Sequence, residues 1–256
     1  MKKHLTMIAG AALIVLTGCS REPLAEDSRT EVLGAEIVNE APTRTTYDGT
    51  TGKFAWESGD QIALFLKKDT YKTQVVKVTP TTAPKGTFVY SKETGYTRNG
   101  YAVYPAAMAK AWNGTTLTLT LPASYTASFT TPLPLVAVNS GETSNLLFYP
   151  ACGLLRIKCD NLPATTVTVT LDKGITGDFA VSDPATAPKI EAMTVSASHL
   201  ASVDFTDAGT GATLDLPLPC GDYSSVTVTC GTQSKEVEVP FTITRGMGKK
   251  LHVTFE

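Results

Sequence analysis

Apolar and polar positions alternate along most of this 256-residue chain. Leu117, Leu119 and Leu121 are separated by threonines, and Val226 and Val228 repeat the same pattern. A period of two places every second side chain on the same face of a β-strand. Threonine is β-branched and tolerates water, so it suits the outer face of such strands. The pattern therefore predicts a chain built mainly of strands that bury one face.

Turn signals separate these runs. The dipeptides at 48–49 (Asp-Gly), 99–100 and 113–114 (both Asn-Gly) supply the positive φ angles of tight turns. A helical period with caps is not visible, and only residues 190–200 leave a short helix or an irregular connection open. We therefore expect an all-β fold of two antiparallel β-sandwich domains, with a boundary near residues 139–141.

The first residues have the form of an export signal. Lysines precede a nearly unbroken apolar run over residues 7–16, which is too short to span a bilayer as a permanent helix. The run leads into Leu-Thr-Gly-Cys at 16–19, which resembles a bacterial lipobox, where a peptidase cuts before the cysteine and the thiol receives a diacylglycerol. We predict a signal peptide at 1–18 and lipid attachment at Cys19. An ordinary secretory signal with an incidental cysteine is the alternative.

Behind the signal, the chain is long enough for two ordinary β domains. Residues 19–30 are polar and lack an apolar period, so we interpret them as a flexible tether from the lipid to the folded body. We place the N-terminal sandwich at 31–141 and the C-terminal sandwich at 142–256.

Charge and motifs give little indication of catalysis. The formal net charge is −2, spread along the chain, whereas a nucleic-acid-binding surface needs clustered Lys and Arg, so we expect no nucleic-acid partner. Past the signal the chain has two histidines, His199 and His252, and neither stands in a nucleophile or metal-ligand pattern. We predict no enzyme and no cofactor, although paired carboxylates on different strands would leave a glycosidase open.

Four cysteines lie in the second half of the chain: Cys152, Cys159, Cys220 and Cys230. Export would permit one or two disulfides among them. Each cysteine sits in an apolar, strand-like run, which favours a free thiol packed as a small hydrophobe. Their spacing does not suit zinc, so we predict no metal site.

Local patterns follow one another over nearly the whole chain. In one of these patterns, at residues 56–62, Trp56 and Ile62 flank a Gly-Asp turn, so we expect the indole to pack on the core. With the lipobox, the patterns resemble the fimbrillin superfamily of pilus subunits, the type V pilins. In chain order they are Thr43-Arg44-Thr45, 56–62 (WESGDQI), 101–105 (YAVYP), 121–122 (LP), 153–157 (GLLRI), 218–223 (LPCGDY) and 245–246 (RG).

That resemblance implies transthyretin-like sandwiches, cell adhesion, and a place on the outer membrane and in a fimbrium. In the family, an Arg-directed protease removes the first strand of a lipidated precursor, and a strand from the next subunit fills the groove. The implied partners are therefore other pilus subunits, an Arg-specific protease and the outer membrane through the lipid.

Residues 32–38 are the candidate for the displaced strand. Leu33, Ala35 and Ile37 share one face, and Glu36 lies on the other. A slip of one residue would turn Glu36 inward, so the register is well specified.

Arg44 is the candidate cleavage site, because it follows Pro42 in a polar connection of the kind that proteases enter. A cut after Arg44 would remove the 32–38 strand and the lipid together. Arg29 is a competing site, but a cut there would leave the strand in place.

A second function remains open, that of a surface lipoprotein that binds a glycan or host ligand without polymerising. Trp112 and Tyr125 are the aromatic candidates for stacking on sugar rings, although a role for Trp112 in covering the end of a sandwich is favoured. The last strand, at 251–255, is either donated to a neighbour or part of its own sandwich, so a stalk, a tip and an anchor all remain possible positions.

We expect the protein isolated from its native membrane before any Arg-directed cleavage to begin at Cys19 and to carry lipid. Intact mass spectrometry of the membrane-bound chain measures both properties. An unmodified thiol at Cys19 would contradict the lipobox interpretation.

Overall fold

The computed structural model describes residues 29–38, 55–82, 84–127, 131–237 and 240–256. Strands joined by turns make up this part of the chain, together with one short 3-10 helix, η1 (Ala106–Met108). The all-β fold predicted from the alternation is confirmed. None of the described residues forms a helix long and apolar enough to cross a membrane.

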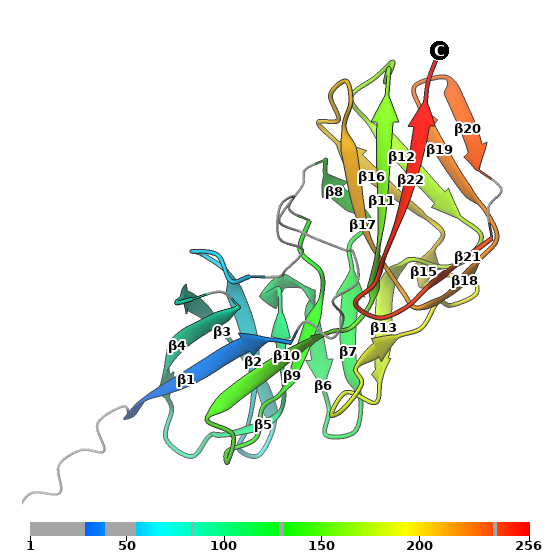
Figure 1. Cartoon of the computed structure of the whole chain (residues 1–256). Helices are drawn as coiled ribbons and strands as arrows, with labels where there is room; N and C mark the ends of the chain where they lie inside the picture. The colour runs from blue at the N-terminus through cyan, green and yellow to red at the C-terminus, as the bar shows by residue number, and fades with distance from the viewer. Residues whose placement is uncertain (1–28, 39–54, 83, 128–130, 238–239) are drawn as a thin grey trace, which may run out of the picture.

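Seven strands close into a barrel in the order β1-β10-β9-β5-β2-β3-β4 (Figure 1). Neighbours in it are antiparallel, except that β1 and β10 run parallel. The barrel strands are β1 (Arg29–Ile37), β2 (Gln61–Lys67), β3 (Tyr71–Pro80), β4 (Lys85–Lys92), β5 (Thr97–Tyr104), β9 (Leu135–Val138) and β10 (Asn145–Pro150).

Trp56 anchors the barrel core. It precedes a turn in which the Asp60 amide donates to the Glu57 carbonyl at 3.2 Å, and Gly59 provides the positive φ of +102°. The indole packs edge-on against Phe148, with the ring centres 5.1 Å apart. As the sequence predicts, the tryptophan beside this turn is a core residue, with 5% of its surface exposed.

Two further sheets pack face to face as a sandwich around a second core. The last strand, β22, pairs in parallel with β11, and Val253 and Phe255 enter that core. The final strand is therefore part of its own sandwich. One sheet contains β17 (Thr213–Leu218), β11 (Gly153–Asp160) and β22 (Gly248–Thr254), and the other contains β20 (Gln233–Val237), β19 (Val226–Cys230), β12 (Val167–Leu171), β16 (Ser202–Thr206) and β8 (Ser124–Thr126).

A connecting sheet lies between the barrel and the sandwich (Figure 1). Its core joins Phe65 and Val103 of the barrel to Leu119 and Phe179 of the connecting sheet. This sheet contains β6 (Ala109–Trp112), β7 (Leu117–Leu121), β13 (Thr176–Ser182) and β14 (Lys189–Ile190), with β15 (His199–Leu200) paired to β13, while β18 (Gly221–Tyr223) and β21 (Phe241–Ile243) form a separate pair.

Four pairings between described strands connect the two predicted domains across residue 141. β10 pairs with both β1 and β9, β7 pairs with β13, and β8 pairs with β16. The division into 31–141 and 142–256 stays a prediction, with the connecting sheet built from both sides of it. The 190–200 region is an irregular connection, because only β14 and β15 at its ends form strands.

Adjacent leucines on β10 test the barrel core. Leu146 is fully buried, whereas Leu147 is 40% exposed on the outer face. We expect Leu146→Ala to lower the free energy of unfolding by about 2–5 kcal/mol, because it leaves a cavity. Leu147→Ala should change it by only about 0.5 kcal/mol. Urea unfolding monitored by tryptophan fluorescence compares the two variants, and equal losses would contradict the assigned facing of β10.

Candidate functional site

The strand β1 is held on both sides. It runs antiparallel to β4, from Arg29 opposite Lys92 to Glu36 opposite Lys85, and parallel to β10 over its second half. Figure 1 shows β1 in blue as one of the barrel strands. Among the described strands, β1 alone joins β4 to β10, so it closes the barrel.

The three apolar side chains expected on the inner face of this strand lie there. Leu33, Ala35 and Ile37 are 1%, 1% and 3% exposed and belong to the barrel core, whereas Val32 points outward and is 63% exposed. The Trp56 indole donates to the Ala35 carbonyl at 3.3 Å, which fixes the middle of the strand.

Glu31 lies two residues before Leu33, on the same side of β1, so its carboxylate reaches side chains of the neighbouring barrel strands. One of its oxygens accepts a hydrogen bond from the Tyr90 hydroxyl at 2.5 Å, and the other accepts one from Arg98 Nη2 at 2.9 Å. Tyr90 is the residue directly opposite Glu31 on β4, whereas Arg98 reaches it from β5. The carboxylate therefore joins three barrel strands.

Arg98 is a buried cation, with 5% of its surface exposed. Its Nη1 donates to Asn139 Oδ1 at 3.3 Å, and the fully buried Asn139 amide donates in turn to the Phe65 carbonyl at 3.0 Å. Arg98 Nε has no hydrogen-bond partner among the described residues. A buried guanidinium held this way depends on its carboxylate, because an unpaired charge in the interior is strongly destabilising.

The electrostatics keep Glu31 ionised. Burial raises the pKa of its carboxyl, but the hydrogen bond from Tyr90 and the positive charge of Arg98, with a smaller effect from Lys92, lower the pKa further than burial raises it. The net pKa is below the usual glutamate value. Burial and the neighbouring carboxylate raise the pKa of Tyr90, so the phenol stays neutral and donates.

Sequence reasoning did not find this cluster. The predicted strand began at Val32, which left Glu31 outside it. Arg98 stands beside the Asn-Gly pair at 99–100, which was predicted to be a turn, where arginines are usually solvated, but the structure places that pair inside β5. The two-residue period of a strand could have indicated it, because Glu31 is two residues before Leu33 and so belongs to the same face.

The aromatic residues considered for sugar stacking are engaged in packing. Trp112 lies over Gly100, where a Cβ would be 2.2 Å from its Nε1, and it packs edge-on against Tyr101 at 4.8 Å. Tyr125 was expected to be exposed, and this is wrong: its ring stacks on Phe205 and its hydroxyl is buried. Stacking on the apolar ring of Phe205 holds the Tyr125 ring on the inner side of β8.

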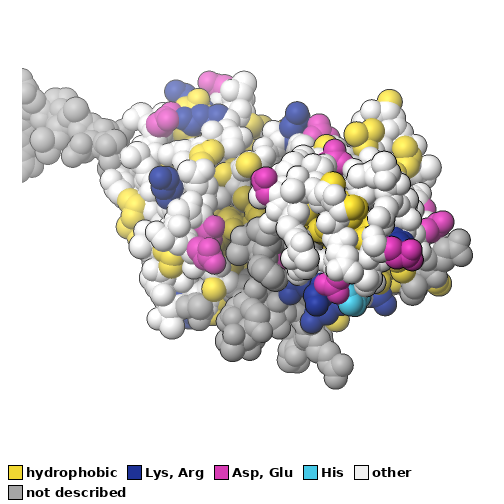
Figure 2. All heavy atoms as spheres, turned by 90° about the horizontal axis from the view of Figure 1, so that it is seen from above, with side chains coloured by type: hydrophobic (Ala, Val, Ile, Leu, Met, Phe, Trp, Pro, Cys, Tyr) yellow, Lys and Arg dark blue, Asp and Glu magenta, His cyan; other side chains and the backbone are white. Residues whose placement is uncertain are grey.

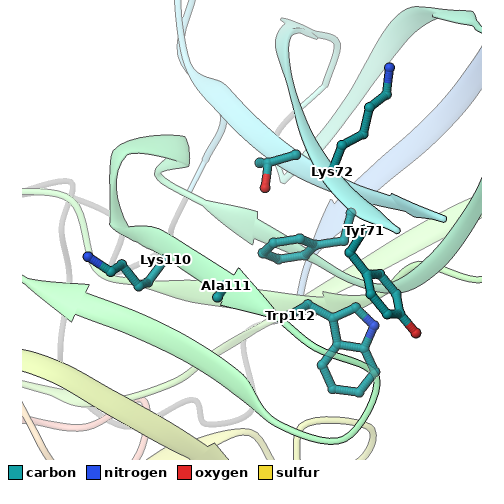
Figure 3. Close-up of a pocket in the computed structure, with 7 residues that line it drawn as sticks. Tyr71, Lys72, Lys110, Ala111 and Trp112 are labelled. Atoms are coloured by element: carbon teal, nitrogen blue, oxygen red, sulfur yellow. The ribbon is translucent and has the colours of Figure 1, made fainter. Parts of the chain in front are cut away.

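Trp112 also borders a shallow pocket of about 180 Å³ (Figure 3). Tyr71 and Trp112 lie side by side there, while the Lys72 and Lys110 side chains extend away from the rings. Lys72 pairs with Glu93 and Lys110 pairs with Asp178, so both ammonium groups already have partners. The pocket is smaller than the roughly 300–1,000 Å³ of typical ligand sites.

The other predicted site residues are placed as follows. Cys19 and Arg44 lie outside the described residues, so lipid attachment and cleavage there stay predictions. His252 is exposed and hydrogen-bonds Asp160 at 2.6 Å, and His199 packs against Phe179. The described residues contain no cluster of three or more His, Cys, Asp or Glu side chains suited to a metal ion.

All four cysteines of the second half are free, buried thiols, as their apolar contexts favoured. Burial raises the pKa of Cys159 to about 12 and the pKa of Cys220 to about 11. These two thiols are therefore protonated at neutral pH.

Charged side chains are interspersed on the visible surface. On the face shown in Figure 2, Lys and Arg side chains lie among Asp and Glu side chains and among uncharged polar surface. Elsewhere on the surface, charged side chains form exposed ion pairs, such as Lys189 with Glu191. Such exposed pairs contribute little to stability.

No family model matches the chain, and no curated protein matches it in sequence. Among solved structures, a candidate cell adhesion protein from Bacteroides uniformis is 17% identical with a TM-score of 0.50, and the match covers 89% of this chain and 94% of that one. A candidate cell adhesion protein from Bacteroides ovatus is 16% identical with a TM-score of 0.48, covering 90% and 93%. A fimbrial assembly protein from Parabacteroides distasonis is 10% identical with a TM-score of 0.38, covering 88% and 91%. The match to the Bacteroides uniformis protein shows a shared fold.

The charge cluster predicts a pH dependence of stability. Since the folded-state pKa of Glu31 lies below the ordinary glutamate value of 4.5, the ionised carboxylate stabilises the fold above pH 4.5 and loses this effect as pH falls through the folded pKa. We expect Glu31→Gln to destabilise the protein at pH 7 and the difference from wild type to shrink between about pH 5 and about pH 3. Tyr90, Arg98 and Lys92 are the groups that face Glu31.

Urea unfolding at a series of pH values measures this difference. Glu36→Gln is the matched control, because Glu36 lies on the outer face of the same strand, 3.9 Å from Lys85. If the difference in unfolding free energy between wild type and Glu31→Gln did not change with pH, the assigned ion pair would be contradicted.

Proposed function

We propose that this chain is a fimbrial subunit or a fimbria-associated adhesin. It is exported as a lipoprotein to the outer membrane and assembles after a protease releases its first strand. The observation that carries the proposal is the place of β1, which closes the barrel between β4 and β10 and fills its core with Leu33, Ala35 and Ile37.

Loss of β1 would leave a groove with two binding edges. Eight residue pairs join β1 to β4 and four join it to β10, so both neighbours would expose unpaired N–H and C=O groups. Main-chain hydrogen bonds do not depend on side-chain identity, so another extended segment can make them, and its alternate side chains can fill the core. The groove is therefore suited to β-augmentation.

The connection after β1 is where release has to occur. Cleavage after Arg44 separates β1 and the lipid at Cys19 from the rest of the chain in one step. Cleavage at Arg29 would cut at the start of β1 and leave its three core side chains covalently attached. Arg44 is thus the cleavage site that opens the groove, and the protease that cuts there is a partner of the protein.

A non-polymerising surface lipoprotein that binds a glycan is the alternative function. The packing of Trp112 and Tyr125 gives it little support, because neither ring offers a free face in a pocket of sugar size. We also propose that the chain has no enzymatic activity. Its role is to assemble and to adhere.

Arg44→Ala tests the proposal. We expect an Arg-specific protease to convert the wild-type protein to a lipid-free chain that begins at Thr45 and forms multimers, whereas Arg44→Ala keeps its lipid and stays monomeric. Arg29→Ala is the control and should be processed like the wild type. Intact mass spectrometry reports the N-terminus, and size-exclusion chromatography reports assembly.

A wild-type chain that stays monomeric and lipid-bound after protease exposure would contradict the proposal. A lipid-free chain from Thr45 that remains a monomer would contradict strand exchange between copies of this chain and leave a different subunit as the donor.

A further inference from the structure

The slot that β1 occupies holds a charge as well as an apolar lining. Among the described residues, Glu31 is the one carboxylate within ion-pair distance of the buried Arg98, at 2.9 Å. If β1 leaves, the partners that Arg98 keeps are neutral: the Asn139 and Gly141 oxygens, at 3.3 Å and 3.4 Å, and the Tyr90 hydroxyl. The Arg98 side chain, which is 2% exposed with β1 in place, then lacks a counter-charge.

Tyr90 adds a second donor aimed at the same place. Its hydroxyl and Arg98 Nη2 donate to the two oxygens of one carboxylate, from β4 and β5 respectively. Asn139 holds the guanidinium from behind and is itself bonded to the Phe65 carbonyl, so the donor pair is positioned by the barrel and not by β1. The slot therefore contains a preformed carboxylate-binding position.

We propose that this position selects the strand that replaces β1: the incoming segment of another protein chain carries Asp or Glu two residues before the first of its buried apolar side chains. The inference rests on the proposed function, since it describes the occupant of the opened groove. It names the chemistry of that partner, an extended segment with one inward-facing acid.

The carboxylate also sets the register of the occupant. A shift of one residue turns the acid to the outer face and leaves Arg98 unpaired. A shift of two residues places an apolar side chain against the guanidinium and the acid against apolar core, or into solvent. The apolar positions discriminate less, because Leu33 and Ile37 are similar in size and differ mainly from the small Ala35 between them.

The space in the middle of the slot, beside the small central side chain, is already filled. Ala35 lies opposite Gly86, where a Cβ would be 2.7 Å from Val78 and 2.8 Å from Trp56. The indole and the valine fill this space. The preferred occupant therefore presents an acid, a large apolar, a small and a second large apolar side chain at alternate positions.

Peptide exchange into the cut protein tests the inference. The full chain receives one engineered protease site within residues 39–54, is cut in its folded state, and is incubated with fluorescent peptides of residues 29–38 in urea below its unfolding transition. Fluorescence anisotropy gives the affinity of each peptide. Because the sequence changes are made in the peptides, the folding of the protein is the same in every measurement.

Three peptide variants separate charge from position. Glu31→Gln removes the inward carboxylate, and Glu36→Gln removes an outward one with the same change in net charge. The third peptide exchanges Thr30 and Glu31, which keeps the composition and moves the acid to the outer face. We expect the first and third to bind roughly tenfold to hundredfold more weakly than the parent peptide, and Glu36→Gln to bind like the parent.

A second comparison uses Arg98→Met in the cut protein. The preference for the parent peptide over Glu31→Gln should disappear in that variant, because the group that reads the acid is gone.

The outcomes separate the two proposals. Equal binding of the parent, Glu31→Gln and exchanged peptides would overturn the carboxylate rule while leaving strand replacement intact. Entry of no peptide, including the parent, would overturn strand replacement and the rule with it. A preference for the inward acid that Arg98→Met abolishes would support both.

Discussion

Closure of the barrel by β1 is the constraint on which the rest of the N-terminal part depends. An open sheet leaves two rows of unpaired N–H and C=O groups, and closure removes them. In this barrel the closing strand is also the first described one, and its link to the body runs through residues outside the described part. The element that satisfies both edges is therefore the first strand of the described part of the chain.

The charge inside the barrel makes this closing strand specific. Apolar side chains at 33, 35 and 37 fill space, but an apolar surface accepts many residues of similar volume. The buried guanidinium of Arg98 accepts only a carboxylate without a large loss of stability. Burying the network from Glu31 through Arg98 to Asn139 costs desolvation free energy, but its hydrogen bonds form in only one register of β1.

The C-terminal part is organised differently. Its last strand, β22, is paired with β11 along its length and contributes Val253 to the core, so the sandwich uses its own terminal strand. The connecting sheet, made of β6, β7, β13 and β14, ties this sandwich to the barrel through a shared core. The hydrogen-bonded ladders of the sandwich are thus separate from the two barrel edges that β1 satisfies.

Alternation and turn chemistry determined the all-β class, the inward face of Leu33, Ala35 and Ile37, and the core position of Trp56, because each depends on neighbours within a few residues. Tertiary structure alone decided that β10 pairs with β1 across more than a hundred residues, that Tyr125 turns inward against Phe205, and that Arg98 lies beside Glu31. The alternation says which side of a strand is buried and not which strand lies next to it. Pairing between distant strands is chosen by the fit of the whole core, and a buried charge becomes visible only when that core surrounds it.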